Sequence, residues 1–541
     1  MKTRAARIGI RAAGAILFVA AHTQAPLYWS NQNQYLLHGL AAGGFGNLHR
    51  DWLANTADPT PAFSGLIEFI FRFGDPRFFY LLYALILALY FLSLMALASR
   101  VPHGPRTPLG ELRLVVGLIV IHSAVARWAS VQLFGGDYPW FLQAGVANQY
   151  VLGPGLQPSA YGVFLVAAVA AFACDRLWLT AIFIAGAAAM HPTYLLPGAL
   201  LMLGFLHVLW WENRRIACVL LGVGALALVT PIIVHGGRQF APSSPESFAE
   251  AQRILVDFRL PHHARIDHWL DGVAAAQIGW IIAGILLLRR SRLFMVMLIA
   301  FSLATGLTLL QWLTDSRTLA LLFPWRLSAV LMPIATTVIL ARTITLVHPG
   351  DEREEIECSW RLGLWPAMLA VIAMAVAAAG LVMQIGGVFY GWPEDEQAVY
   401  EFAARNAAAG DCYLVPVVVP DPARTSRGSP STTFVPLARA TAMNKFAADW
   451  QRFRLATGVP IYADFKSIPY RDVDVVEWRR RIDKAVDWQT RLPADEMRHA
   501  GITHVIAPAE KAFDAAQFER VFQTGPFQVL RLRRDGTKAT D

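Results

Sequence analysis

Apolar segments of nearly membrane-spanning length recur along the first 384 residues and are separated by short polar or basic turns. A helix that crosses the hydrocarbon core of a bilayer needs about 20 mostly apolar residues. Eleven segments approach this length: 8–28, 77–98, 113–133, 156–174, 177–190, 194–211, 216–235, 272–288, 293–312, 324–343 and 362–384. The pattern predicts a polytopic α-helical membrane domain, residues 1–384. A kinked hairpin is an alternative where the fifth and sixth segments meet at "HPTYLLP".

The pattern changes after residue 384. "VDVVEWRRRIDKAVDW" has the apolar spacing of an amphipathic helix, whereas "GVPIYADF", "GITHVIAP" and "FQVLRLRR" have the composition of short strands. Helices that alternate with strands are typical of a small α/β domain. Residues 385–541 are therefore predicted to form a soluble domain outside the membrane.

Composition agrees with this division. Of the 541 residues, 55% are hydrophobic and 16% are charged, against about 25% charged in soluble domains. The net charge of +8 comes largely from arginines at the ends of apolar segments, so it gives no reason to expect nucleic acid as a partner. Cys174, Cys218 and Cys358 lie in or beside apolar segments, and Cys412 alone lies in the C-terminal domain. That domain can form no internal disulfide, and no cysteine cluster has zinc spacing.

Arginines and lysines indicate the orientation. They precede the first segment and mark every second connection after it, and basic short loops stay cytoplasmic. The N-terminus is then cytoplasmic, and an odd number of spans places residues 385–541 on the outer side. The first segment also resembles a signal peptide, but its apolar stretch continues toward Trp29, which favours a retained helix. The longer outer loops are 29–76, 134–155, 236–271 and 313–323.

The first outer loop is rich in polar side chains. Asn31 and Gln34 lie just after the first segment, and Asp51 and Asp58 follow. "AFSGLIEFIFRF" has the rhythm of a helix that lies in the membrane interface. Asp51 is a candidate catalytic residue, with a helix cap or an ion pair with Arg50 as the structural alternative.

The second outer loop combines amides, a carboxylate and aromatic rings. Asp137, Gln149 and Tyr150 stand among glycines and prolines that prevent one long helix. This mixture suits a sugar, because amides and carboxylates bind hydroxyl groups while aromatic rings cover the sugar ring. Tyrosine and tryptophan also gather at membrane interfaces without any catalytic reason.

The third outer loop contains "FRLPHHARIDHW". Arg259 is a candidate phosphate ligand, because a guanidinium binds phosphate with two parallel hydrogen bonds. His262 and His263 are adjacent, whereas helical metal sites place histidines at i and i+4. A phosphate-facing cavity is therefore predicted, while a metal site, Arg–Asp pairing and a plain loop stay open.

Further charged or imidazole groups interrupt apolar segments. Arg326 begins the tenth segment, Arg127 lies within the third, and His191 stands between the fifth and sixth. A charge inside a membrane protein is costly and marks a functional site by default, with snorkelling to the interface as the alternative. In the C-terminal domain Lys466 is the candidate substrate ligand, and surface salt bridges are the alternative there.

The chain resembles the GT-C superfamily of membrane glycosyltransferases, in particular bacterial members that end in a small soluble domain. The resemblance covers nearly the whole chain and rests on "SNQNQYLLHGL…RDWLANTADPTP", "QPSAYGVFLV…AMHPTYLLPG", "FRLPHH", "FPWRLS" and "FRLATGVPIYADFKS…VEWRRR". It implies transfer of a sugar from a polyprenyl-phosphate donor to an envelope glycan, lipid or protein. It also implies a bacterial inner-membrane location and envelope-assembly partners.

The resemblance implies an acid near the end of the first helix, which serves as base or metal ligand. Asn31, Gln32, Asn33 and Gln34 stand there instead, and an amide cannot accept a proton. Asp51, Asp58 and Asp137 are the remaining candidates for the base. The expected substrate ligands are Asn31, Gln34, Arg127, Gln149, Tyr150, His191, Arg259, His262, His263, Arg326 and Lys466. No cofactor is identified, and a divalent cation stays open. A non-catalytic scaffold and a transporter of an anionic lipid-linked substrate are the alternative functions.

Overall fold

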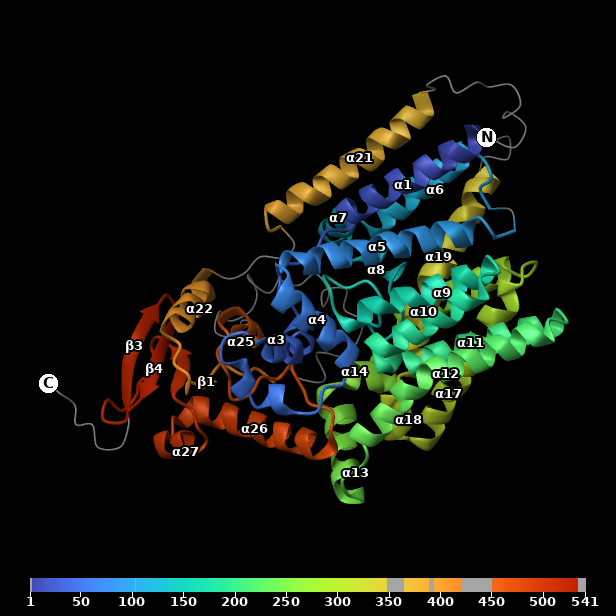
Figure 1. Ribbon diagram of the computed structural model, residues 1–541. Helices are drawn as coiled ribbons and strands as arrows, with labels where there is room; N and C mark the ends of the chain where they lie inside the picture. Colours follow the sequence, from blue (N-terminus) through green and yellow to red (C-terminus); the bar gives the residue numbers. More distant parts are fainter. Residues whose placement is uncertain (1, 103, 348–363, 389–393, 420–449, 534–541) are drawn as a thin grey trace.

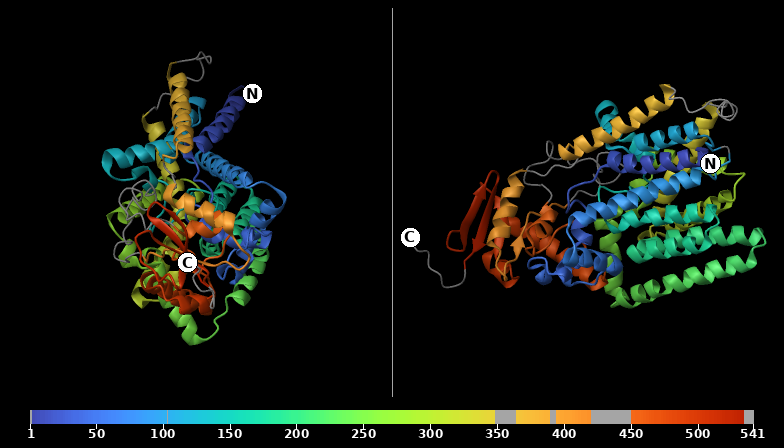
Figure 2. Two further views of the ribbon diagram at one scale, coloured as in Figure 1. Left: turned by 90° about the vertical axis from the view of Figure 1, so that its left-hand side faces the viewer. Right: turned by 45° about the horizontal axis from the view of Figure 1, so that its top comes forward.

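The computed structural model describes residues 2–102, 104–347, 364–388, 394–419 and 450–533. Long helices run side by side through most of the molecule, and a small sheet lies at the end away from the N-terminus (Figures 1 and 2). Cys358 lies outside the described residues.

The first half of the chain is helical apart from its connections. Its helices are α1 (Lys2–His22), α2 (Gln32–Tyr35), α3 (Leu37–Gly43), η1 (Leu48–Arg50), η2 (Leu53–Asn55), α4 (Pro61–Phe73), α5 (Arg77–Ala98), α6 (Pro108–His122), α7 (Ala124–Phe134), α8 (Tyr138–Phe141), η3 (Pro158–Gly162), α9 (Val163–Ala173), α10 (Leu177–Met190), η4 (Pro192–Tyr194), α11 (Leu195–Trp211) and α12 (Arg215–Gln239).

The second half continues with helices and ends in strands. Its elements are α13 (Pro245–Arg253), η5 (Ile254–Arg259), α14 (Pro261–Ala264), α15 (Ile266–Trp269), α16 (Gly272–Leu287), α17 (Leu293–Thr314), α18 (Arg317–Leu321), η6 (Pro324–Leu327), α19 (Ser328–Val347), α21 (Leu364–Ile385), α22 (Glu394–Asn406), β1 (Tyr413–Leu414), η8 (Trp450–Arg452), α25 (Phe453–Thr457), α26 (Asp472–Arg491), α27 (Ala494–His499), β2 (His504–Pro508), β3 (Phe518–Thr524) and β4 (Phe527–Leu532).

Seven helices of the described part are long and apolar enough to cross a membrane, or eight if a bent pair counts as one span. The chain is thus an integral multi-pass membrane protein. Each of the eleven predicted segments is largely helical in its described part, although the first ends at His22 and not at residue 28. The number of eleven clean spans is corrected. Three of them, at Pro158–Ala173, Leu177–Met190 and Gly272–Leu287, are shorter than a span.

The bent pair replaces the predicted span 113–133. α6 and α7 meet at an angle of 58°, because Ser123 has extended backbone angles between them. Its hydroxyl accepts a hydrogen bond from the N–H of Ala126 and so caps the new helix. The sequence pattern shows the apolar run, but it does not show that the Ser123 side chain binds the N–H of Ala126 and starts a new helix there.

Small residues let several helices approach closely. A Cβ added at Gly204 of α11 would lie 2.8 Å from Cα of Val296 in α17, and one at Gly284 of α16 would lie 2.5 Å from Cβ of Ala335 in α19. Small residues at such crossings allow close backbone packing between membrane helices.

The four strands form one mixed sheet in the order β1-β2-β4-β3. β1 pairs with β2 in parallel, whereas β2 with β4 and β3 with β4 are antiparallel. "GVPIYADF" was predicted as a strand, but it contributes only an isolated bridge between Ile461 and Tyr413. The N–H of Ile461 donates to the carboxylate of Asp51 instead of to a neighbouring strand.

The C-terminal segments share their core with two of the outer loops. Ala251 and Ile254, from the third loop, lie in one buried cluster with Trp478 of α26, and Trp52 of the first loop packs against it. The division of the chain at residue 384 stays a prediction. What the packing establishes is that α26 lies against the outer loops, next to α13 (Figure 1).

Candidate functional site

Three cationic side chains from three distant segments lie near the imidazole of His263. Arg259 ends η5, Arg326 lies in η6, and Lys466 lies between α25 and α26. Burial and the positive charges of Arg326, Lys466 and Arg259 together lower the pKa of His263 to about 3. We call Arg259, Arg326 and Lys466 the cationic site. It lies near α14, where the helices meet the C-terminal segments (Figure 1).

Arg259 is held by its surroundings without an acidic partner. Its side chain is buried, lies over the ring of Phe465 at 5.2 Å, and donates from Nη2 to the carbonyl oxygen of Lys466 at 2.6 Å. Its Nε is buried without a hydrogen-bond partner. Asp464 is near enough to favour the charged form, although burial still lowers the pKa of Arg259. No carboxylate in the described part forms an ion pair with this guanidinium.

Arg326 reaches the site because of a sharp turn. Phe323 has left-handed backbone angles, with φ at 48°, and Pro324 then begins η6. Nη1 of Arg326 donates to Oγ1 of Thr193 at 2.7 Å and to Nε2 of His191 at 3.3 Å. Its Nε is buried without a partner, as is Nδ1 of His191. Arg326 likewise has no carboxylate within ion-pair distance among the described residues.

The histidine pair lies beside the cations. Nδ1 of His263 donates to the carbonyl oxygen of Ala147 at 2.6 Å, so Nε2 is left as an acceptor. The rings of His262 and His263 have centroids 4.0 Å apart. Burial, and then the charges of His263, Arg259 and Lys466, lower the pKa of His262. Both rings are therefore neutral at pH 7.

Tyrosines complete the wall of the site. The hydroxyl groups of Tyr35 and Tyr470 are 3.0 Å apart, and the ring of Tyr35 meets the edge of His191. Gln34 donates from Nε2 to the hydroxyl oxygen of Tyr470 at 3.0 Å. Tyr35 and Tyr470 did not stand out in the sequence, because tyrosine is common near membrane interfaces.

Tyr150 connects the first and second outer loops. Its hydroxyl oxygen accepts a bond from the Asn31 side chain at 3.4 Å, and its ring lies 5.3 Å from that of Trp140. Gln149 is buried next to it, and its Nε2 has no hydrogen-bond partner. The roles of Asn31, Gln34, Gln149 and Tyr150 as substrate ligands stay predictions.

Asp51 has a fully buried carboxylate whose two oxygens are both engaged. Oδ1 accepts from the N–H of Leu53 at 2.9 Å. Oδ2 accepts from Nε of Arg454 at 3.1 Å and from the N–H of Ile461. Arg454 also lies 2.9 Å from Asp464. This buried triad joins the first outer loop to α25, so the geometry of Asp51 is that of a structural link.

The other two candidate bases are also held by local partners. Asp137 is buried in an ion pair with Arg127 at 2.8 Å and caps α8 by accepting from the N–H of Trp140. Burial raises the pKa of Asp137 against the opposing charge of Arg127. Asp58 accepts from the N–H of Thr60 at 2.8 Å. Their assignment as bases, and that of Arg127 as a substrate ligand, stay predictions.

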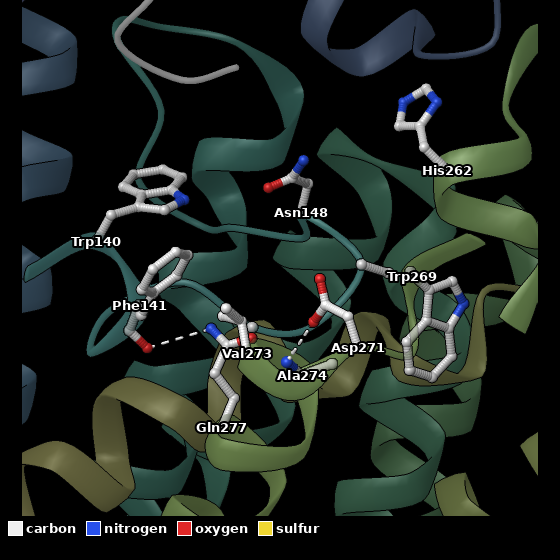
Figure 3. A pocket seen from close by; sticks show the side chains of 11 residues that line it. Trp140, Phe141, Asn148, His262, Trp269, Asp271, Val273, Ala274 and Gln277 are labelled. Carbon is white, nitrogen blue, oxygen red and sulfur yellow. Dashed lines mark hydrogen bonds between the residues drawn. The ribbon is translucent and has the colours of Figure 1, made fainter. Parts of the chain in front are cut away.

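His262 also lines a pocket that opens to solvent, with about 390 Å³ of empty space when the open solvent is included. Trp140, Asn148, Trp269 and Asp271 are among its lining residues (Figure 3). In the described ranges no three His, Cys, Asp or Glu side chains gather in a way that could hold a metal ion. Asp271 and Trp269 were not singled out from the sequence, because only the fold brings them next to the second outer loop.

These features define an integral multi-pass membrane protein with a cluster of cationic side chains near His263. Residues 441–485 are similar to a family described as a domain of unknown function, DUF6798. The matched segment includes Lys466 and Tyr470 of the site, and also Arg454 of the buried triad with Asp51. No curated protein matches the chain.

Proposed function

We propose that the protein is a membrane glycosyltransferase whose cationic site binds the phosphate of a lipid-linked sugar donor. The observation that carries this proposal is the pair of arginines, Arg259 and Arg326, that both lie near His263 and have no carboxylate at ion-pair distance in the described part. A buried charge that lacks an opposite charge is costly, and a bound anion would supply one.

Phosphate is the anion that this arrangement suits best. The guanidinium groups offer planar donors that match phosphate oxygens. His262 and His263 are neutral, so they do not repel an anion. Arg326 lies within a candidate membrane span, Arg317–Val347. A bound isoprenoid lipid would thus keep its tail in the bilayer while its phosphate reaches the site.

The cations also fit the chemistry of sugar transfer. An acceptor oxygen would form a bond to the anomeric carbon, while the bond from that carbon to the phosphate oxygen breaks with its electron pair. The acceptor proton would pass to a base, and the developing phosphate charge would fall on Arg259, Arg326 and Lys466. Donors preorganised around a developing charge are the largest single contribution in many enzymes.

One observation favours a second candidate, a non-catalytic protein that binds the same lipid phosphate. Both oxygens of Asp51 accept bonds from Arg454 and backbone N–H groups, so Asp51 has no free lone pair directed at the cationic site. This scaffold function shares the phosphate site and differs only in the absence of transfer.

The test measures binding of undecaprenyl phosphate to the purified protein in detergent, by the shift of its thermal unfolding midpoint with lipid concentration. Arg259→Ala and Arg326→Ala should each weaken binding at least tenfold. Arg253→Ala is the matched control, because Arg253 is an exposed arginine of the same loop that pairs with Glu250 at 2.6 Å.

Unchanged binding in both arginine variants would contradict the phosphate site. Binding that depends on the arginines, without release of undecaprenyl phosphate from any donor in a panel of undecaprenyl-phosphate sugars plus envelope extract, would favour the scaffold function.

A further inference from the structure

One carboxylate oxygen of Asp271, in the pocket beside the cationic site, makes no hydrogen bond to the described residues. Asp271 caps α16, with Oδ1 accepting from the N–H of Ala274 at 2.8 Å. Among the described residues, the second oxygen of Asp271 has neither a hydrogen bond nor an ion pair. Figure 3 shows this oxygen on the side of Asn148, facing the space between the two tryptophans.

The two indole rings of the pocket are fixed by packing outside it. Trp140 lies under the guanidinium of Arg127, 4.3 Å from its carbon to the ring centroid. Trp269 meets Trp325 edge-on, with centroids 5.7 Å apart. Both rings are buried. Figure 3 places Trp140 and Trp269 on opposite sides of the pocket.

The backbone of the second outer loop is strained at this point. Ala147 and Asn148 both have left-handed angles, with φ at 56° and 54°. Two consecutive residues other than glycine in this region are unusual, and such strain gathers at ligand sites. The result here is that the carbonyl of Ala147 holds His263, while the Asn148 side chain enters the pocket.

His262 connects the pocket to the cationic site. It lines the pocket, and its ring is tilted by 50° against that of His263, which lies near Arg259, Arg326 and Lys466. A phosphate bound to the cations would therefore lie near the histidine pair that borders the pocket.

We propose that this pocket binds the sugar ring of the lipid-linked substrate, with Asp271 accepting a hydrogen bond from a ring hydroxyl and Trp140 and Trp269 flanking the ring. The proposal rests on the proposed phosphate site. Its chemistry follows from the lining: a carboxylate oxygen and an amide bind hydroxyl groups, and indole faces cover the C–H face of a sugar.

The experiment compares the full-length protein's affinity for bare undecaprenyl phosphate with that for a panel of undecaprenyl-phosphate hexoses and pentoses in detergent. At least one sugar-bearing lipid should bind tenfold or more tightly than the bare lipid. Asp271→Ser should abolish this gain and keep the affinity for bare lipid within twofold. Serine caps a helix as well as aspartate does, so α16 should still begin correctly.

Asp267→Ser is the matched control. Asp267 is an exposed aspartate of the same loop that pairs with Arg265 at 2.9 Å and does not line the pocket. It should leave both affinities unchanged.

The proposal is overturned if no sugar-bearing lipid binds better than bare undecaprenyl phosphate, or if the gain survives in Asp271→Ser. In either case binding of bare lipid that is lost in Arg326→Ala would still support the phosphate site. Failure of the bare lipid to bind at all would instead remove both proposals.

Discussion

Arginine has two different roles at the junction of helices and C-terminal segments, and the difference lies in its partners. Arg454 lies between Asp51 and Asp464 in a buried, neutralised cluster. Arg259 and Arg326 lie against carbonyl, hydroxyl and imidazole groups that carry no negative charge. Only the second kind leaves a local positive charge for a ligand.

Asp51→Ala is expected to destabilise the protein by about 3–5 kcal/mol, because it removes one partner of a buried ion pair and leaves Arg454 with Asp464 alone. Thermal unfolding in detergent measures the loss. Asp58→Ala, which removes a single cap to Thr60, should cost only about 1 kcal/mol. A stable Asp51→Ala protein that has lost sugar transfer would instead support Asp51 as the base.

Acidification is expected to destabilise the protein through His263. Its folded pKa is about 3, below the usual value of about 6.5 for histidine. Between pH 3 and pH 6.5, therefore, His263 is protonated in the unfolded chain and neutral in the folded chain. The stabilisation is complete above pH 6.5 and falls by about 2 kcal/mol by pH 5.

The measurement compares unfolding midpoints at pH 7 and pH 5. His263→Gln should reduce the loss of stability at pH 5. His49→Gln, at an exposed position, should leave the loss unchanged. Equal acid sensitivity in the His263 variant and the wild type would show that the His263 ring is not the group responsible.

At the scale of elements, short irregular segments position the site while the long helices provide the frame. η5 ends at Arg259 just before Pro261, and η6 begins after the left-handed Phe323. Neither turn follows from hydrophobic periodicity, which describes helices of several turns. The predicted strand at 458–465 failed for a related reason, since Asp51 takes the N–H group of Ile461.

Gly46→Ala should separate the first outer loop from α25. Gly46 has φ at 53°, and a Cβ there would lie 2.5 Å from the carbonyl oxygen of Gly458, which accepts the N–H of Asn47. The strain predicts a loss of about 1–3 kcal/mol and faster proteolysis of the first loop. Gly65→Ala in α4, where a Cβ meets nothing within 4 Å, is the control and should not destabilise. If the first loop is cleaved at the same rate in Gly46→Ala as in the wild type, the predicted role of this contact is wrong.

At the scale of the whole molecule, charged turns gather at the end of the helices away from the C-terminal segments. Arg292 pairs with Asp175 and Glu212, which brings three turns together, and Arg7 and Arg11 both contact Glu111. Figure 2 shows the N-terminus and the sheet at opposite ends of the long axis. Basic turns at one end favour a cytoplasmic location for that end.

Alkaline phosphatase, which is active only outside the cytoplasm, should therefore be active when it is fused after residue 541 and inactive when it is fused after Arg290. The reversed pattern would contradict the predicted orientation of the chain. It would leave the cationic site unchanged, because that site depends on the packing of the loops and not on which side of the membrane they face.

The sequence by itself determined the helical membrane-protein class and the positions of all eleven apolar helices, because hydrophobic length and period are local properties of the chain. It also indicated most residues of the cationic site, since Arg326 and "FRLPHH" are unusual beside apolar helices. Helix length fell short at Ser123, whose hydroxyl caps a new helix within one apolar run.

Only the tertiary structure decided which charges cancel. Asp51 and Arg454 are 403 positions apart, and no spacing rule connects them. Likewise Asp271 becomes a pocket residue only because the second and third outer loops pack together. Pairing and cavities depend on contacts between distant segments, so they follow from the fold as a whole and not from any single stretch of sequence.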